Sequence, residues 1–358
     1  MTNNATQHRE SLTWNELMSQ GAVWPSLIAH LGRSATVETI LASSRKTESW
    51  LFVGCGTSFY LAEAAAMSWT MLTGQPARAL PASEVLLYSA LTGVQNNNAQ
   101  AVVISRSGQT SEAVRAASVL KRELHFPTIG ITCAEKSALE SECDHAVVLS
   151  MADDKSTVMT RSFTSMLIGL QYLAARRGAN AEFIQSLQGM ASQAAPLIHS
   201  VAAKMESFVS THSFADYVFL GQGPFYGVAR EAALKVMEMS CSYSQAFQSL
   251  EFRHGPKAIV SPQTCLTFYL SETGQQAETE VLQEMKELGG MTIAVCNVAS
   301  KKVRDASDLV IEVNVSGNEL ALLAPYSLPA QLMGFFTGIG KGLNPDHPKN
   351  LTRVVVLE

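Results

Sequence analysis

A short apolar run enters a Gly-x-Gly turn in Glu48-Ser-Trp-Leu-Phe-Val-Gly-Cys-Gly-Thr-Ser58, and Asp216-Tyr-Val-Phe-Leu-Gly-Gln-Gly223 repeats the pattern. Gly54 and Gly221 are 167 residues apart. Three further matched pairs follow in the same order: Val103–Gln109 with Tyr269–Gln275, Thr128–Cys133 with Thr292–Cys296, and His145–Ser150 with Asp308–Val313. Landmarks in one order at a nearly constant spacing indicate a duplicated domain.

Each copy alternates short apolar runs with stretches of helical character, such as Tyr60–Thr73, Ser111–Leu124 and Gly227–Ser240. Strands that alternate with helices form βαβ units, which build a parallel sheet covered by helices on both faces. We therefore expect an α/β fold of two tandem doubly wound parallel-sheet domains, each a three-layer αβα structure, with flanking helices. Ligands of such domains bind outside the carboxyl ends of the strands.

The landmarks also predict where the domains begin and end. We expect an N-terminal helical segment (1–47), a first domain (48–178), a linker helix (179–212), a second domain (213–340) and a C-terminal tail (341–358) over the active site. Helices are expected over Leu12–Leu31, Ser162–Arg176 and Asn180–Val209.

Composition narrows the class of protein. The 358 residues are 47% hydrophobic and 16% charged, which is typical of a soluble globular protein with room for two cores. The net charge is −5 and no Lys/Arg run exceeds two residues, so nucleic acid is not expected as a partner. Six cysteines form no C-x-x-C or zinc-binding pattern, and we expect reduced thiols in a cytoplasmic protein.

The most apolar stretch runs from Leu320 to Gly340. It contains Pro325, Pro329 and Gln331, and it has no basic flank on its N-terminal side. These features favour a buried or subunit-contacting helix over a membrane span. The polar N-terminus also lacks the core of a signal peptide, so no membrane partner is expected.

A candidate phosphate site follows the apolar run Ala101–Ile104, in Ser105-Arg-Ser-Gly-Gln-Thr-Ser-Glu112. The hydroxyls of Ser105, Ser107 and Thr110 gather where a helix begins, and its unpaired N–H groups and dipole favour an anion. Capping alone would need one hydroxyl rather than three. Thr57 and Ser58, in the other strand-to-helix turn, can face the same ligand.

A Gly-x-Gly turn after a strand also suggests a dinucleotide site. The third glycine is missing after Gly56, and no acidic residue follows at the spacing that holds a ribose. Gly221–Gly227 has the same ambiguity and lacks the following βα unit with an acidic residue. We therefore expect no NAD(P). In the second copy Glu272 replaces Arg106 and Gln276 replaces Thr110; a carboxylate beside a phosphate is repulsive, so the first copy is expected to bind the phosphate.

The motifs at 54–58 and 105–110 resemble the sugar isomerase (SIS) domain family. Glu231–Ser240 and Glu251-Phe-Arg-His-Gly-Pro256 look like the isomerase half of glucosamine–fructose-6-phosphate aminotransferase. They look equally like relatives that isomerise or deaminate hexosamine 6-phosphates. Arg253-His-Gly-Pro-Lys257 and the Arg353-Val-Val tail look closer to the tagatose-6-phosphate or galactosamine-6-phosphate branch. Asn344–Leu351 resembles the C-terminal tail of that group, so the likeness extends from about Glu48 to the end.

The resemblance implies a role for each matching residue. Glu238 would be the base that moves a proton between C1 and C2, Lys235 would assist it, and His254 would open the sugar ring from a neighbouring subunit. That last role implies a homodimer or larger homo-oligomer. Further residues would bind the substrate. The phosphate would be bound by Ser58, Ser105, Ser107 and Thr110. The sugar would be bound by Thr57, Arg106, Thr157 and Thr160, and Arg353 of the tail would also contact the substrate.

Arg353 departs from the family. Relatives of the synthase type have a lysine in the tail that forms an imine with the ketose, and here the position reads Leu351-Thr-Arg-Val-Val355. A guanidinium stays protonated and forms no imine. The tail therefore favours the isomerase or deaminase branch.

The residues support this chemistry independently. A carbonyl shift needs a base that removes a carbon-bound proton, and a carboxylate in an apolar helix, such as Glu238, suits it. Lys235 shares its helix face, although a structural ion pair would look the same. His254 precedes Gly-Pro, so it lies on a loop and suits proton exchange, or it is exposed without a role. No His/Asp/Glu cluster has metal-ligand spacing, so we expect proton transfer without metal or cofactor.

Three functions stay open. The first is an aldose–ketose isomerase or isomerising deaminase of hexose or hexosamine 6-phosphates. The second is a deglycase of phosphorylated fructosamine adducts. The third is a non-catalytic sugar-phosphate sensor, which the presence of Glu238, Lys235 and His254 disfavours.

Overall fold

The computed structural model describes residues 9–93 and 98–357. The chain forms two compact units, each around one five-stranded parallel sheet. The N-sheet unit holds the first copy and comprises Ala22–Asp154, Arg161–Gln188 and the residues from Thr352 onward. The C-sheet unit holds the second copy and comprises the residues up to Gly21, Lys155–Thr160 and Gly189–Leu351. The expected fold class is confirmed, and the domain boundaries drawn from sequence stay a prediction.

The sheet of the N-sheet unit has the order β2-β1-β3-β4-β5. Its strands are β1 (Ser49–Gly54), β2 (Ala77–Pro81), β3 (Ala99–Ile104), β4 (Thr128–Thr132) and β5 (His145–Val148). The chain moves outward in one direction from β1 to β2 and in the other from β3 to β5. The switch point, where such sheets bind ligands, therefore lies between β1 and β3.

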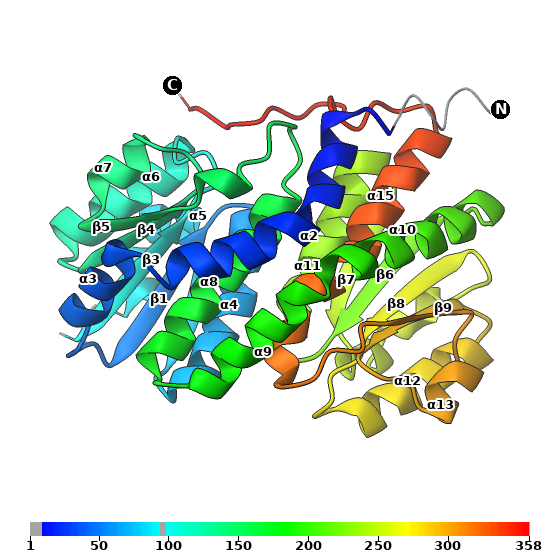
Figure 1. Ribbon diagram of the computed structural model, residues 1–358. Coiled ribbons are helices and arrows are strands. Elements are labelled where there is room, and N and C mark those ends of the chain that lie inside the picture. Colours follow the sequence, from blue (N-terminus) through cyan, green and yellow to red (C-terminus); the bar gives the residue numbers. More distant parts are fainter. Residues whose placement is uncertain (1–8, 94–97, 358) are drawn as a thin grey trace. The chain divides into compact units, whose positions relative to one another are not determined.

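Helices cover both faces of this sheet (Figure 1). Leu51 and Val53 point to a face covered by α5 (Ala82–Leu87), α6 (Ser111–Ser118) and α7 (Ala138–Glu142). Trp50 and Phe52 alternate to the other face and contact Trp69 of α4 (Thr57–Thr73). Helices α3 (Ala35–Ser43) and α8 (Arg161–Arg177) pack there too. This alternation follows from the period of two in a strand.

The C-sheet unit repeats the topology, with the order β10-β9-β8-β6-β7 and its switch point between β6 and β8. The strands are β6 (Asp216–Gly221), β7 (Tyr243–Gln248), β8 (Thr264–Tyr269), β9 (Met291–Cys296) and β10 (Leu309–Glu312). Helices α12 (Gln275–Glu287) and α13 (Lys301–Asp305) cover one face in Figure 1. The other face is covered by α10 (Ala194–Thr211), α11 (Pro224–Ser240) and α15 (Leu328–Gly340).

Three expected helices can be compared with the structure. Helix α2 (Leu12–Leu31) has the predicted bounds, and α8 exceeds its prediction by one residue at each end. The third was expected as one helix over Asn180–Val209 and is two helices in the structure. Helix α9 (Ala181–Ser192) ends at Ser192, Gln193 separates the two, and α10 begins at Ala194. Pro196 lies in the first turn of α10, where proline is tolerated, whereas it would interrupt one continuous helix. The proline therefore marks this break, and the expectation of a single helix was wrong.

The apolar stretch near the C-terminus consists of η6 (Glu319–Leu322), α14 (Leu323–Tyr326) and α15. Within residues 9–93 and 98–357 it alone is long and apolar enough to cross a membrane, and 94% of its most apolar window is buried. Such burial is typical of a core helix, as expected from its prolines and Gln331.

In both copies, an aspartate at the amino ends of the strands accepts a backbone hydrogen bond and forms an ion pair with a lysine. The Asp144 carboxylate accepts a hydrogen bond from the Thr128 N–H (2.8 Å) and pairs with Lys121 (3.0 Å). In the second copy, the Asp308 carboxylate accepts from the Thr292 N–H (2.8 Å) and pairs with Lys286 (2.5 Å). The duplication seen in the sequence therefore extends to individual side-chain contacts.

Candidate functional site

The two hydroxyl-rich turns of the first copy follow neighbouring strands. Gly54–Ser58 follows β1 and Ser105–Thr110 follows β3, and Val53 is in register with Val103. The carboxyl ends of adjacent parallel strands meet at one edge of a sheet. The predicted phosphate-binding hydroxyls therefore share the switch-point edge of the N-sheet unit.

The loop Ser105–Thr110 has a conformation that requires its glycine. Gly108 has φ +60°, and a Cβ there would overlap the Ser137 side chain and lie 2.9 Å from Thr132 Oγ1. Thr110 is the N-cap of α6, yet its side chain makes no capping hydrogen bond. Its hydroxyl lies 3.4 Å from Ser105 Oγ. Capping therefore does not account for the Thr110 hydroxyl, which faces another hydroxyl at the start of a helix.

The turn after β1 brings two more hydroxyl residues to the start of α4. Gly56 is the N-cap with φ +53°, and a Cβ on Gly54 would overlap the backbone of Ser58. Thr57 and Ser58 open the helix and are buried. These glycines serve a close strand-to-helix turn.

Arg106 and Arg353 are joined in the N-sheet unit. The buried Arg106 guanidinium donates from Nη2 to the Arg353 carbonyl (2.6 Å). Burial lowers the pKa of Arg106, and Arg353 lowers it further, while Asp154 and Asp153 oppose the shift. The Arg353 side chain donates to Asp153 Oδ1 (2.7 Å) and to the Asp154 carbonyl (2.8 Å). The tail is thus fastened beside the hydroxyl loop.

Two more bonds attach the tail to the start of α6. The Ser111 N–H donates to the Val355 carbonyl (3.2 Å), and the Leu357 N–H donates to Ser111 Oγ (3.0 Å). Sequence reasoning did not single out Asp153, Asp154 or Ser111 as partners of the tail, because the contacts link positions about two hundred residues or more apart.

In the C-sheet unit, Lys235 lies between two carboxylates of α11. Its Nζ contacts Glu231 Oε1 (3.2 Å) and also donates to Glu238 Oε2. The Lys235 and Glu231 side chains are 1% and 0% exposed, whereas that of Glu238 is 19% exposed. Glu238 is therefore the carboxylate of this array that solvent can reach.

The charge state of Lys235 follows from its surroundings. Burial lowers its pKa, but the Glu231 and Glu238 carboxylates raise it more, so the pKa lies above its ordinary value. Lys235 is thus an ammonium that holds Glu238 through one oxygen. Glu231 was not among the predicted site residues, although its i, i+4 spacing to Lys235 could have identified it.

His254 lies on the expected loop. It follows η4 (Glu251–Arg253), is exposed, and precedes Gly255 with φ +123°. Arg253 pairs with Glu284 (2.8 Å), as does Lys257 (2.5 Å) on the far side of the histidine. The loop is therefore anchored to α12 at both ends, and the imidazole stands between the anchors.

Thr157 and Thr160 belong to the C-sheet unit as well. The Thr157 hydroxyl donates to the Asp346 carbonyl (3.4 Å), and the Thr160 carbonyl accepts from Gln331 Nε2 (3.2 Å). The segment is also held by the buried Glu16, which accepts from the Ser156 N–H (3.2 Å) and from the Ser156 hydroxyl. Glu16 gave no signal in the sequence, because its partner is 140 positions away.

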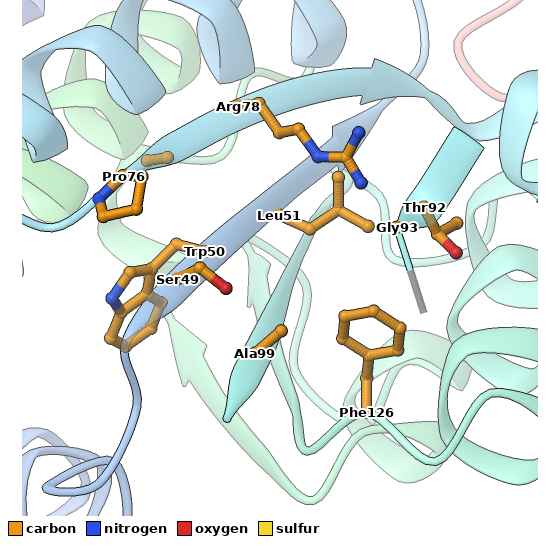
Figure 2. Close-up of a pocket in the computed structure, with 10 residues that line it drawn as sticks. Ser49, Trp50, Leu51, Pro76, Arg78, Thr92, Gly93, Ala99 and Phe126 are labelled. Atoms are coloured by element: carbon orange, nitrogen blue, oxygen red, sulfur yellow. The ribbon is translucent and has the colours of Figure 1, made fainter. Parts of the chain in front are cut away.

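The N-sheet unit also has a cavity of about 270 Å³, away from the hydroxyl loop, and Figure 2 shows the residues that line it. Trp50, Leu51 and Phe126 line it, and the Arg78 guanidinium lies above Leu51. These residues stand at the amino ends of the strands, whereas ligands of doubly wound sheets bind at the carboxyl ends. This cavity is therefore not the candidate site.

Comparison with known proteins gives one consistent family. The model of the SIS domain matches residues 44–176 and again 216–335. A glutamine–fructose-6-phosphate aminotransferase of Methanothermobacter thermautotrophicus is 25% identical over 315 residues, which are 87% of this chain and 52% of the relative. The chain thus spans about half the length of such relatives.

Solved structures agree with this family. Glucosamine-6-phosphate deaminase from Thermotoga maritima has a TM-score of 0.80 at 28% identity, over 97% of this chain and 100% of that one. Tagatose-6-phosphate ketose/aldose isomerase from Escherichia coli has a TM-score of 0.83 at 23% identity, over 98% and 96%, which shows the shared fold. With two matched domains and two sheets of one topology, this chain belongs to the SIS domain family.

Proposed function

We propose that this protein is an aldose–ketose isomerase or isomerising deaminase of hexose or hexosamine 6-phosphates. The observation that carries the proposal is the Glu231–Lys235–Glu238 array, in which a buried ammonium fixes one solvent-reachable carboxylate. A base fixed through one oxygen keeps the other for a substrate proton. The relatives and structural neighbours, which are named for reactions of sugar phosphates, support the same class.

In this proposal the first copy holds the phosphate. Ser58, Ser105, Ser107 and Thr110 donate to its oxygens, and Thr57, Arg106, Thr157, Thr160 and Arg353 serve the sugar or fasten the segments that enclose it. The support is the position of the hydroxyls at the switch point, beside the start of α6, where an anion is favoured.

Glu238 then performs the proton transfer. It removes the proton at C2 of the open-chain sugar and returns it to C1, through an enediol or, for an amino sugar, an enolamine. Protonation of the enolamine at C1 gives a ketimine, which one water hydrolyses to the ketose phosphate and ammonia. His254 exchanges the proton that opens the ring. Its exposure on a loop supports action on a neighbouring subunit, and hence a homodimer or larger assembly.

The tail favours a route without a covalent imine. Arg353 stands where synthase relatives have lysine, and its guanidinium is paired with Asp153. A free ketose or ketimine then suits the site better than one bound to the protein. The 28% identity with a glucosamine-6-phosphate deaminase supports this branch.

A substrate panel tests the proposal. The purified protein is incubated with the 6-phosphates of glucosamine, galactosamine, fructose and tagatose, and ammonia and ketose are measured. We expect turnover of at least one, with ammonia released only from amino sugars. Phosphate-dependent binding without any turnover would instead indicate a sensor, and release of amino acid from a phosphorylated fructosamine adduct would indicate a deglycase.

A further inference from the structure

The second copy retains a loop in the place of the phosphate loop, and a side chain occupies it. Ser271–Gln275 follows β8 and opens α12, as Ser105–Gln109 follows β3 near α6. The N–H groups of Glu272 (2.7 Å) and Thr273 (3.1 Å) both donate to Glu319 Oε2. The Thr273 hydroxyl donates to Glu319 Oε1. Three donors thus converge on one carboxylate.

The occupying carboxylate comes from a different element. Glu319 begins η6, 46 positions beyond Thr273. It is therefore not a local cap of α12, and it reaches the loop from outside as a bound anion would. Backbone N–H groups and a hydroxyl at a helix start are the donors that hold phosphate in other proteins.

A second carboxylate, that of Glu278, accepts from the first residue of this loop. Ser271 donates to Glu278 Oε2 from both its N–H and its hydroxyl, each at 2.8 Å. Ser249 donates to the other oxygen of Glu278 (3.2 Å). Glu278 is buried, and burial raises its pKa despite these bonds. The first serine of the loop is thereby satisfied inside the protein.

We infer that the second loop is an oxyanion site closed by the protein's own Glu319 carboxylate. Glu319 thus determines where phosphate binds: each chain takes one sugar phosphate, at Ser105–Thr110. The inference rests on the proposed function only in treating that first loop as the open site.

There is room for an anion next to the closed loop. A cavity of about 400 Å³ is lined by Ser271, Glu272, Gln275, Asn297 and Ser300. The Glu272 carboxylate accepts from Asn297 Nδ2 (2.7 Å), so its negative charge adds to that of Glu319. Removing Glu319 frees the three donors, and reversing the charge at position 272 removes the repulsion from that side chain.

Equilibrium dialysis with radiolabelled inorganic phosphate tests the inference. The wild type is expected to bind one phosphate per chain and Glu319→Ala two. Glu272→Arg/Glu319→Ala, which restores the arginine that the first copy has, is expected to bind the second phosphate about tenfold more tightly, the gain of one charged contact. Ser107→Ala weakens the first site and assigns each phosphate to its loop.

Thermal unfolding supplies an independent readout. Phosphate is expected to raise the Tm of Glu319→Ala more than that of the wild type. The folded variant would have two phosphate sites, whereas the folded wild type would have one. Glu319→Gln keeps the size of the side chain without its charge, so it serves if the alanine variant does not fold.

The outcomes separate the two proposals. One phosphate bound by the wild type and by every folded variant at position 319 would overturn the closed-site inference. No phosphate bound by the wild type would refute the first-loop assignment, while a site gained in Glu319→Ala would still support closure by Glu319.

Discussion

The two copies have one topology but carry complementary chemistry. Helices α4 and α11 both begin after the first strand of their sheet, and positions 167 residues apart correspond. Where α11 has Glu231, Lys235 and Glu238, α4 has Ala64, Ser68 and Met71. The first copy therefore lacks the carboxylate array that supports proton transfer.

The hydroxyl loops differ in the opposite direction. The first loop brings the hydroxyls of Ser107 and Thr110 to the start of α6. In the second loop, the corresponding donors bond to the carboxylates of Glu319 and Glu278. What remains the same lies away from these edges, as in the matched Asp144 and Asp308 contacts. A duplicated domain can thus keep its scaffold while each copy loses one half of the site.

The largest expected effect concerns the array of the second copy. Glu238→Gln should lower kcat by about 10³-fold, since the amide cannot accept the substrate proton. Met71→Gln, at the corresponding exposed position of α4, is the matched control and should leave kcat unchanged. Steady-state kinetics on the active 6-phosphate measures both, and substantial residual turnover in Glu238→Gln would refute its role as the base.

The next largest difference is expected in how much stability is lost when the glycine of each loop is replaced by alanine. Gly108→Ala should cost about 2–4 kcal/mol of unfolding free energy, because the residue has φ +60° and its Cβ would overlap Ser137. Gly274 has φ −97°, so Gly274→Ala should cost less, about 1 kcal/mol, from crowding of Ser271. Urea denaturation compares them, and equal losses would contradict this difference.

Single hydroxyls of the two loops should be unequal in substrate binding. Ser107→Ala should raise KM about tenfold, the value of one hydrogen bond to a charged group. Thr273 is the counterpart of Ser107 in the closed loop and makes no hydrogen bond to the substrate in this proposal. Thr273→Ala should therefore change KM by less than about twofold. Equal effects on KM would mean that the copies do not divide the work as proposed.

The smallest difference is expected at the repeated aspartates. Burial raises the pKa of Asp144, but the Thr128 N–H and Lys121 lower it more, so the pKa lies below its ordinary value. Burial likewise raises the pKa of Asp308, and Lys286 and the Thr292 N–H lower it more, so this pKa also lies below its ordinary value. Their contribution to stability is present above the unfolded pKa and is lost as pH falls through the lower folded pKa.

Asp144→Asn and Asp308→Asn should therefore each cost under about 1 kcal/mol at pH 7, since these pairs are partly exposed. Each should also flatten the loss of stability below pH 4, the ordinary range of an aspartate. Urea denaturation at several pH values is the measurement. A clear effect in one copy alone would break the equivalence of the scaffolds.

The sequence predicted what local patterns and the duplication contain. The two doubly wound parallel sheets, the loop after β3 and helices α2 and α11 follow from apolar periodicity and strand-to-helix turns, whereas the order of the strands was not predicted. The role of Glu319 was not predicted, since its bonds to Glu272 and Thr273 join distant positions without a shared pattern. The attachment of Arg106 to the Arg353 carbonyl, 247 positions away, was missed for the same reason.

The central claim is that the first copy binds the phosphate while the second moves the proton. Its most direct test measures kcat/KM of the wild type and of Ser105→Ala/Ser107→Ala/Thr110→Ala on one active hexose or hexosamine 6-phosphate and on the same sugar without phosphate. We predict that the triple variant loses most of its kcat/KM on the phosphorylated sugar and keeps that on the plain sugar. An equal loss on both sugars would contradict the account.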